Sequence, residues 1–135
     1  AMIEVGVNAA TDVTGFGLLG HLSQMMKASG TSAAINWSQV PLLPGVLELA
    51  KSGSVSGGTS RNTEALEGAV NFEDGVGDIE FTILADAQTS GGMLISVPEE
   101  RANVLVKNLV ANQTLYSAVI GKVFEGDPGI ITVWQ

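Results

Sequence analysis

The chain has 135 residues, with 14 acidic and 6 basic side chains, 17 glycines and no cysteine. Its length fits one domain, and its 45% apolar content predicts a folded core and excludes a disordered acidic tail. The net charge of −8 argues against a nucleic-acid-binding face, because phosphate neutralisation needs clustered Lys and Arg. The absence of cysteine excludes disulfides, thiolate metal sites and a cysteine nucleophile.

The N-terminal residues carry no basic segment followed by an apolar one, so they do not read as a signal peptide. The uncharged stretch from Ala28 to Leu47 is interrupted by polar side chains and by Pro41 and Pro44, which excludes it as a membrane span. We therefore expect a soluble, cytoplasmic protein with no nucleic-acid or membrane partner.

Hydrophobic spacing and turn residues predict an alternation of helices and strands. In the first half of the chain we expect a helix over 15–29, a strand over 32–37, a short helix over 44–51 and a loop over 53–58. An acidic loop over 64–78, with a short strand near 70–72, precedes a segment over 79–84 that fits either strand or helix. In the rest of the chain we expect a strand over 93–97, a helix beginning at Pro98, and strands over 119–124 and 130–134; the apolar face of that helix consists of Ala102, Leu105, Val106 and Leu109. The turn residues 125–129 predict that the last two strands form a hairpin. The alternation predicts a sheet covered by helices.

Glycine makes up 17 of the 135 residues, about twice the typical share of ~7%. Much of the excess lies in three clusters, at residues 12–21, 57–62 and 86–92, each mixed with hydroxyl or amide side chains. This composition suits the exposure of backbone N–H groups to an anion.

Gly15, Gly17 and Gly20 form a GxGxxG pattern in the first cluster. A dinucleotide site needs a buried strand before these glycines and a carboxylate about 20 residues later. Residues 5–13 make a poor strand, and no carboxylate lies about 20 residues after the glycines. We therefore reject a dinucleotide site. Close helix packing at Gly17 and Gly20 is the favoured interpretation.

Most of the polar residues in these clusters allow both a structural and a ligand-binding interpretation. Asp12 either caps the following helix or binds a hard cation, and the pattern alone favours the cap. His21, the only histidine, lies within an apolar helix and is interpreted as structural. Arg61 either binds an anion or is a solvated loop residue. Residues 88–92 form either a nest of backbone N–H groups or a tight turn.

Together the clusters resemble one family. Residues 10–22 (ATDVTGFGLLGHL), 57–62 (GGTSRN) and 85–92 (ADAQTSGG) resemble, in order and spacing, selenophosphate synthetase (selenide, water dikinase). Residues 41–45 and 119–121 are similar to that family as well. The resemblance implies an α+β fold with a mixed β-sheet flanked by helices, like the C-terminal domain of aminoimidazole ribonucleotide synthetase. It also implies phosphorylation of selenide by ATP, with AMP and phosphate as co-products.

The same resemblance implies a two-domain design. We expect residues 1–135 to be a single, partial C-terminal domain that lacks its first strand and helix. The family's reactive Cys or selenocysteine and its catalytic lysine belong to an N-terminal domain, so no catalytic residue is assigned here and the chain alone is expected to be inactive. The missing strand would expose a sheet edge, which predicts a homodimer or strand exchange.

By the resemblance, Asp12 matches an aspartate that binds Mg²⁺ together with N-terminal carboxylates, which reverses the preference for a cap. Thr14, Gly15 and Gly17 would lie beside it. Further candidates for the same Mg²⁺–ATP cleft are Gly57, Gly58, Thr59, Arg61, Asn62, Gln88, Thr89, Ser90, Gly91 and Gly92. Two alternatives stay open: a non-catalytic binding or assembly module, and a paralogous ATP-dependent kinase or ligase of the same superfamily.

Overall fold

A computed structural model describes all 135 residues. Its helices are α1 (Met2–Val5), α2 (Gly17–Ser29), α3 (Val46–Lys51), α4 (Gly57–Ala65), α5 (Asp78–Leu84) and α6 (Glu99–Ala111), with a 3₁₀ turn over Trp37–Gln39. Its strands are β1 (Ala9–Asp12), β2 (Ser32–Asn36), β3 (Val70–Phe72), β4 (Met93–Ser96), β5 (Gly121–Phe124) and β6 (Ile131–Trp134). None of the helices has the length and apolar character needed to cross a membrane.

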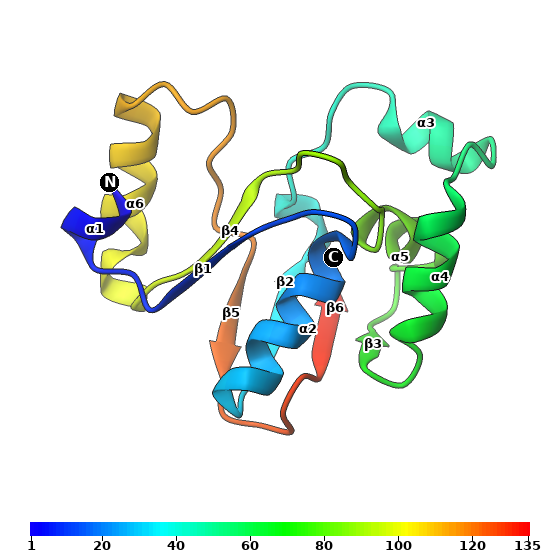
Figure 1. Ribbon diagram of the computed structural model, residues 1–135, viewed down its shortest axis with the longest axis horizontal. Helices are drawn as coiled ribbons and strands as arrows, with labels where there is room; N and C mark the ends of the chain where they lie inside the picture. Colours follow the sequence, from blue (N-terminus) through cyan, green and yellow to red (C-terminus); the bar gives the residue numbers. More distant parts are fainter.

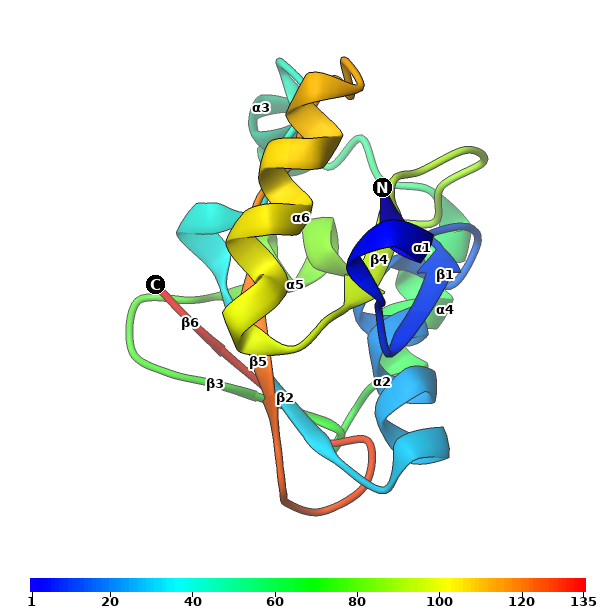
Figure 2. The same cartoon turned by 90° about the vertical axis from the view of Figure 1, so that its left-hand side faces the viewer.

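The main sheet has four strands in the order β3-β6-β2-β5. β2 and β6 run parallel, as do β3 and β6, whereas β2 and β5 are antiparallel. Helices α2 and α4 lie to one side of these strands (Figure 2), and α2 packs on β2 and β6. The expected mixed sheet flanked by helices is therefore confirmed.

The predicted hairpin between the last two strands is wrong. β5 and β6 do not pair with each other, because β2 lies between them and pairs with both. The turn over residues 125–129 instead passes the start of β2, where the Ser32 hydroxyl donates to the Asp127 carbonyl (2.7 Å) and the Gly129 N–H donates to the Thr31 carbonyl (3.0 Å). Turn residues specify a reversal of the chain, and they do not specify which strand fills the space beside it.

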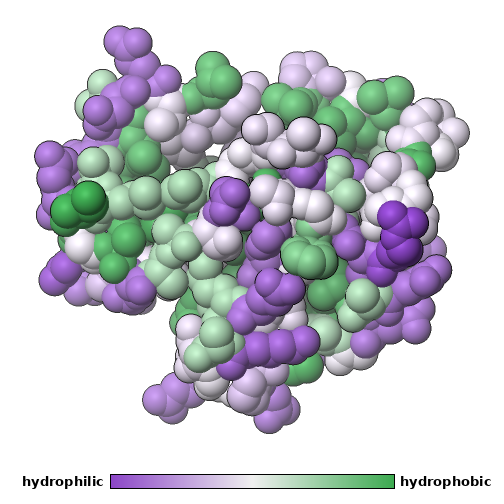
Figure 3. Space-filling view, in the orientation of Figure 1, coloured by the Kyte–Doolittle hydropathy of each residue, from purple (hydrophilic) through white to green (hydrophobic).

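Strands β1 and β4 form a separate antiparallel ladder in which Ala9 is opposite Ser96 and Asp12 is opposite Met93. In Figure 1 this ribbon connects the part of the molecule formed by α1 and α6 with the part formed by the sheet and the other helices. Figure 3 shows the α1–α6 part standing off from the rest across a notch, with apolar and polar side chains interspersed over the visible face.

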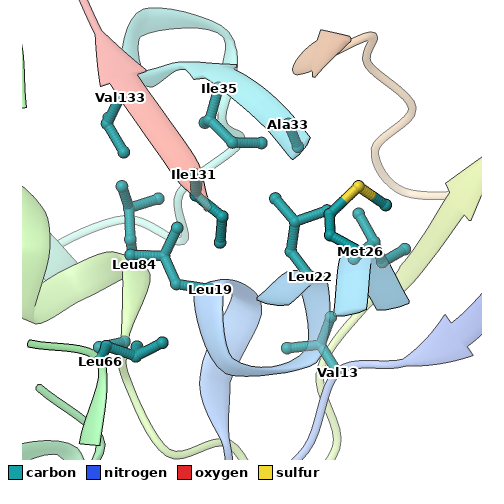
Figure 4. Close-up of a cluster of buried hydrophobic side chains, with 12 residues drawn as sticks. Val13, Leu19, Leu22, Met26, Ala33, Ile35, Leu66, Leu84, Ile131 and Val133 are labelled. Atoms are coloured by element: carbon teal, nitrogen blue, oxygen red, sulfur yellow. The ribbon is translucent and has the colours of Figure 1, made fainter. Parts of the chain in front are cut away.

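The core forms where α2 meets the sheet. Leu19, Leu22 and Met26 of α2 pack against Ile131 and Val133 of β6 (Figure 4). Leu19, Ile131 and Val133 are completely buried. Burial of each such side chain contributes about 1.5–3 kcal/mol, so α2 is held firmly on the sheet, and the loop that leads into it starts from a fixed point.

Two local expectations differ from the structure. Residues 9–12 form β1, although they were expected to make a poor strand. Helix α4 covers residues 57–65, although loops were expected over 53–58 and from residue 64 on. Residues 79–84, which fitted either strand or helix, are helical as part of α5. In α4 the Ser56 hydroxyl caps the helix by accepting a hydrogen bond from the Thr59 N–H (3.2 Å), and Thr59 is the only buried residue of the helix. A helix with so small a buried face shows no apolar periodicity, which is why the sequence pattern does not reveal it.

Candidate functional site

The three glycine clusters, which are far apart in the sequence, meet beside the N-terminal end of α2. The side-chain amide of Asn62, in the second cluster, donates to the carbonyl of Gly15 (2.8 Å) in the first and to that of Ala85 (2.9 Å), the residue just before the third. The Gln88 N–H donates to the Thr14 carbonyl (3.1 Å), and the Gly91 N–H donates to the Val13 carbonyl (3.0 Å). The loop of residues 13–16 is therefore held from two sides by polar contacts.

Asp12 is the last residue of β1, and its side chain is exposed. Its carboxylate accepts no hydrogen bond from the chain, and the only ion pair in the structure joins the N-terminal amine to Glu4. The residue that caps α2 is Phe16, without a side-chain hydrogen bond, so Asp12 does not cap the helix. The cap interpretation is thus ruled out, and an unpaired carboxylate remains at the end of the strand.

Gly17 is where the chain turns into α2 against the segment that follows α5. Its φ is +70°, and a Cβ at this position would lie 2.6 Å from both the carbonyl carbon and the oxygen of Ala85. Only glycine permits this conformation and this distance at once. The expected role of Gly17 in close packing is confirmed. Gly15 has no atom within 4 Å of a built Cβ and lies in the open part of the loop.

The second cluster is held through Thr59. Its side chain is completely buried, and its hydroxyl donates to Asp86 Oδ1 (2.7 Å) and accepts from the Ala87 N–H (3.1 Å). The side chain of Thr59 therefore joins α4 to the third cluster and does not face solvent. Asn62 does the same through its amide. Both residues are placed to support the loops rather than to contact a ligand directly.

Arg61 is exposed on α4, in contrast to Thr59 and Asn62. A Cβ built at Gly57 would lie 3.7 Å from one guanidinium nitrogen of Arg61, so this side chain folds back over the first turn of its own helix. No carboxylate of the chain pairs with it. A positive charge at a helix N-terminus, close to two glycines, is compatible with an anion, and it is equally compatible with a solvated arginine.

The backbone of the loops offers several hydrogen-bond donors to solvent. The N–H groups of Gly15 and Phe16 in the first cluster, and of Thr89, Ser90 and Gly92 in the third, donate to no acceptor within the chain. All five residues are exposed. The Gln88 and Gly91 N–H groups bind the Thr14 and Val13 carbonyls, so the open donors of residues 88–92 are those of Thr89, Ser90 and Gly92, and the nest interpretation stays a prediction.

The comparison with known protein families gives one match along almost the whole chain. Residues 1–133 match the family described as AIR synthase related protein, C-terminal domain. The chain belongs to this family.

Named relatives of this AIR synthase related domain include selenide, water dikinases. The one from Myxococcus xanthus is 45% identical over 127 residues, covering 94% of this chain and 36% of the relative. The one from Dechloromonas aromatica is 40% identical over 125 residues, covering 93% of this chain and 36% of the relative. The chain thus spans about a third of the length of these relatives. A solved structure of thiamine monophosphate kinase from Aquifex aeolicus is also similar, with 18% identity, a TM-score of 0.45, and coverage of 94% of this chain and 31% of that chain.

The AIR synthase related domain does not contain a complete metal site of its own. No group of three His, Asp or Glu side chains lies close enough to hold an ion. Asp12 offers one hard oxygen ligand without a competing cation, which fits Mg²⁺, but Mg²⁺ prefers six oxygen ligands. The other ligands would have to come from phosphate oxygens, from water or from another domain.

Two contributors to the site were not assigned by sequence reasoning. Asp86 was absent from the candidate residues although it accepts the buried Thr59 hydroxyl, and His21 was interpreted as a structural core residue although its ring contacts the loop that follows Asp12. The position of His21 seven residues after Thr14 carries no recognisable signal. Its contact depends on the turn at Gly17, which is visible only in the folded chain.

Proposed function

We propose that this chain is the C-terminal part of a cytoplasmic selenophosphate synthetase, which phosphorylates selenide with ATP and releases AMP and phosphate. The observation that carries the proposal is the unpaired, exposed carboxylate of Asp12 beside loops with unused backbone N–H groups. The names of the relatives, at 40–45% identity, favour selenide over other acceptors. In this proposal the chain supplies one wall of the Mg²⁺–ATP cleft, and an N-terminal domain supplies the other.

The charges of the chain explain why a cation belongs in this cleft. A chain with a net charge of −8 repels the phosphates of ATP unless positive charge lies between them. When bound, Mg²⁺ would neutralise the charge that develops on the phosphates during phosphoryl transfer. Asp12 would hold the ion from the side of this domain, and the N–H groups of Gly15, Phe16, Thr89 and Ser90 would bind phosphate oxygens.

The remaining candidate residues would position this wall. Asn62 fixes the Gly15 and Ala85 carbonyls, and Thr59 fixes Asp86. Gly91 and Gly92 contact Val13 through their backbones, where the Val13 N–H donates to the Gly92 carbonyl (2.8 Å). In this proposal Arg61, Gly57 and Gly58 contribute positive charge and open N–H groups at the start of α4. No residue of this chain attacks the phosphate.

The experiment that tests the activity compares acceptors in the full-length protein. We expect AMP to form from ATP only when both Mg²⁺ and selenide are present, and we expect residues 1–135 alone to form none. Turnover with another acceptor and none with selenide would favour the paralogous kinase or ligase. Selenide-dependent AMP formation by residues 1–135 alone would contradict the division of labour between two domains. Binding without any turnover would favour the assembly module.

We also propose a homodimer that forms through strand edges. β1 and β4 pair only with each other, and β3 and β5 are the outer strands of the main sheet, so backbone groups on four strands are available for pairing. In sedimentation-velocity experiments on residues 1–135 we expect a dimer, with a monomer fraction that grows on dilution. A single monomeric species at all concentrations would contradict this part of the proposal.

A further inference from the structure

Apart from the open N–H groups of Gly15 and Phe16, the backbone polar groups of the loop after Asp12 are held by other backbone atoms or by Asn62, with one exception. The Thr14 N–H donates to Nε2 of His21 (3.0 Å), across the turn that leads into α2. The Thr14 hydroxyl lies 3.1 Å from the same nitrogen. His21 is therefore the only side chain of α2 that binds the backbone of this loop.

This contact determines which ring nitrogen of His21 carries the proton. An N–H donor points at Nε2, so Nε2 must present its lone pair, and the proton of the neutral ring lies on Nδ1. The ring is also oriented by Phe16, whose ring centroid lies 5.6 Å away with the two planes at 63°. A ring held at its edge and at its acceptor nitrogen has little freedom to turn.

Packing alone does not explain this arrangement. The buried core of α2 consists of residues such as Leu19, Leu22 and Met26, and His21 is only partly buried and lies outside that cluster. A phenylalanine at this position could keep both the apolar contact and the ring contact with Phe16. What an apolar side chain lacks is the acceptor for the Thr14 N–H, two residues after the carboxylate proposed to bind the cation.

We propose that His21 is a positioning residue for Asp12. By holding Thr14 against α2, it fixes the direction in which the chain leaves β1 and therefore the direction in which the Asp12 carboxylate faces the cation. The inference rests on the proposed function for the identity of the ion and the nucleotide. The contact between His21 and Thr14 does not depend on that function.

The test uses the full-length protein with three variants. His21→Leu removes the acceptor. His21→Gln keeps one, because Oε1 of Gln is separated from Cα by the same number of bonds as Nε2 of His. Ser23→Ala is the control: it removes a buried hydrogen bond of the same helix, to the Gly129 carbonyl (3.1 Å), at a residue that does not touch the loop.

Each variant is compared with the wild type by the Mg²⁺ concentration that gives half-maximal AMP formation at fixed ATP and selenide. NMR then measures the hydrogen exchange of the Thr14 amide and the shift of the Val13 amide on addition of Mg²⁺ with ATP. The ¹⁵N shifts of the His21 ring are measured in the wild type. The NMR readouts do not require turnover.

For His21→Leu we expect the half-maximal Mg²⁺ concentration to rise about 10-fold or more, as is typical when a group that orients a metal ligand is lost, together with faster exchange of the Thr14 amide. We expect His21→Gln to recover most of the wild-type Mg²⁺ dependence, Ser23→Ala to leave it unchanged, and the wild-type ring to carry its proton on Nδ1. An unchanged Mg²⁺ dependence in His21→Leu, no recovery in His21→Gln, or a proton on Nε2 would overturn the proposal.

Different results would contradict the proposed function and the role of His21. If the wild-type protein forms no AMP from ATP and selenide, the proposed function is wrong, and the Mg²⁺-dependent shift of the Val13 amide still decides the role of His21. A shift that His21→Leu weakens and His21→Gln restores supports positioning of Asp12. A shift that is the same in all variants, or absent from the wild type, contradicts it.

Discussion

The Asp12→Asn variant of the full-length protein is expected to need at least about 10–100-fold more Mg²⁺ for half-maximal AMP formation, because it loses an anionic ligand to a hard cation. The asparagine side chain has nearly the same shape and keeps one carbonyl oxygen. The Asp12 carboxylate forms no hydrogen bond or ion pair within the chain, so no folded-state contact is lost. The defect should therefore appear in the Mg²⁺ titration and not in thermal stability.

A matched control is available at Asp127. It is also an exposed aspartate, and it lies in the turn between β5 and β6, at the end of the molecule away from the Asp12 end of β1 (Figure 1). Asp127→Asn removes the same charge from the chain and should leave the Mg²⁺ dependence unchanged. Equal effects of the two variants would show that net charge matters and that Asp12 does not bind the ion.

The Gly17→Ala variant is expected to lower the free energy of unfolding by about 2–5 kcal/mol, the sum of left-handed backbone strain and overpacking. The φ of +70° disfavours any residue with a Cβ, and the new methyl group would lie 2.6 Å from the backbone of Ala85. Backbone atoms cannot rotate away as the end of a flexible side chain can. A loss of this size is a large part of the 5–15 kcal/mol that stabilises a typical domain.

Gly15→Ala is the control for that experiment. A Cβ at Gly15 meets no atom within 4 Å and its φ is ordinary, so we expect a change within about 0.5 kcal/mol, as for a surface substitution. Urea unfolding followed by the fluorescence of Trp37 and Trp134, the two tryptophans of the chain, measures both variants. Equal midpoints for the two variants would contradict the close packing of Gly17 on Ala85.

Elements with a strong local signal were predictable from the sequence. The helix over Gly17–Ser29 shows apolar residues at helical spacing and a terminating Gly30, and the helix over Glu99–Ala111 begins after Pro98. The strands β2, β3 and β4 also lie where short runs of strand length were found. In each case the residues that determine the element are neighbours along the chain.

Elements that depend on distant partners were not predictable in this way. β1 is a strand because β4 pairs with it, although its own residues, Ala9–Asp12, are weak strand formers. The order of β5 and β6 depends on β2, about 90 residues earlier in the chain, entering between them. α4 is stabilised by a capping serine and by Thr59 reaching Asp86, which are polar contacts that hydrophobic periodicity does not detect.

The site shows the same division. The three glycine clusters could be recognised from their composition, and their meeting at one place was implied by the family resemblance. Which side chains face solvent could not be predicted, because that depends on the packing of α4 and α5 around Ala85. Thr59 and Asn62 therefore read as ligand candidates in the sequence, and the structure shows that they bind protein atoms instead.

The most direct test of the central claim, that Asp12 faces the cation of bound ATP, is paramagnetic broadening of the full-length protein by Mn²⁺–ATP. Mn²⁺ replaces Mg²⁺ at oxygen ligands and broadens the NMR signals of nearby amides. We expect selective loss of the Val13, Thr14 and Gly15 amide signals, with the signals of α6 retained, and no selective loss in Asp12→Asn. Broadening that spares residues 13–15, or that is the same in Asp12→Asn, would show that Asp12 does not face the cation.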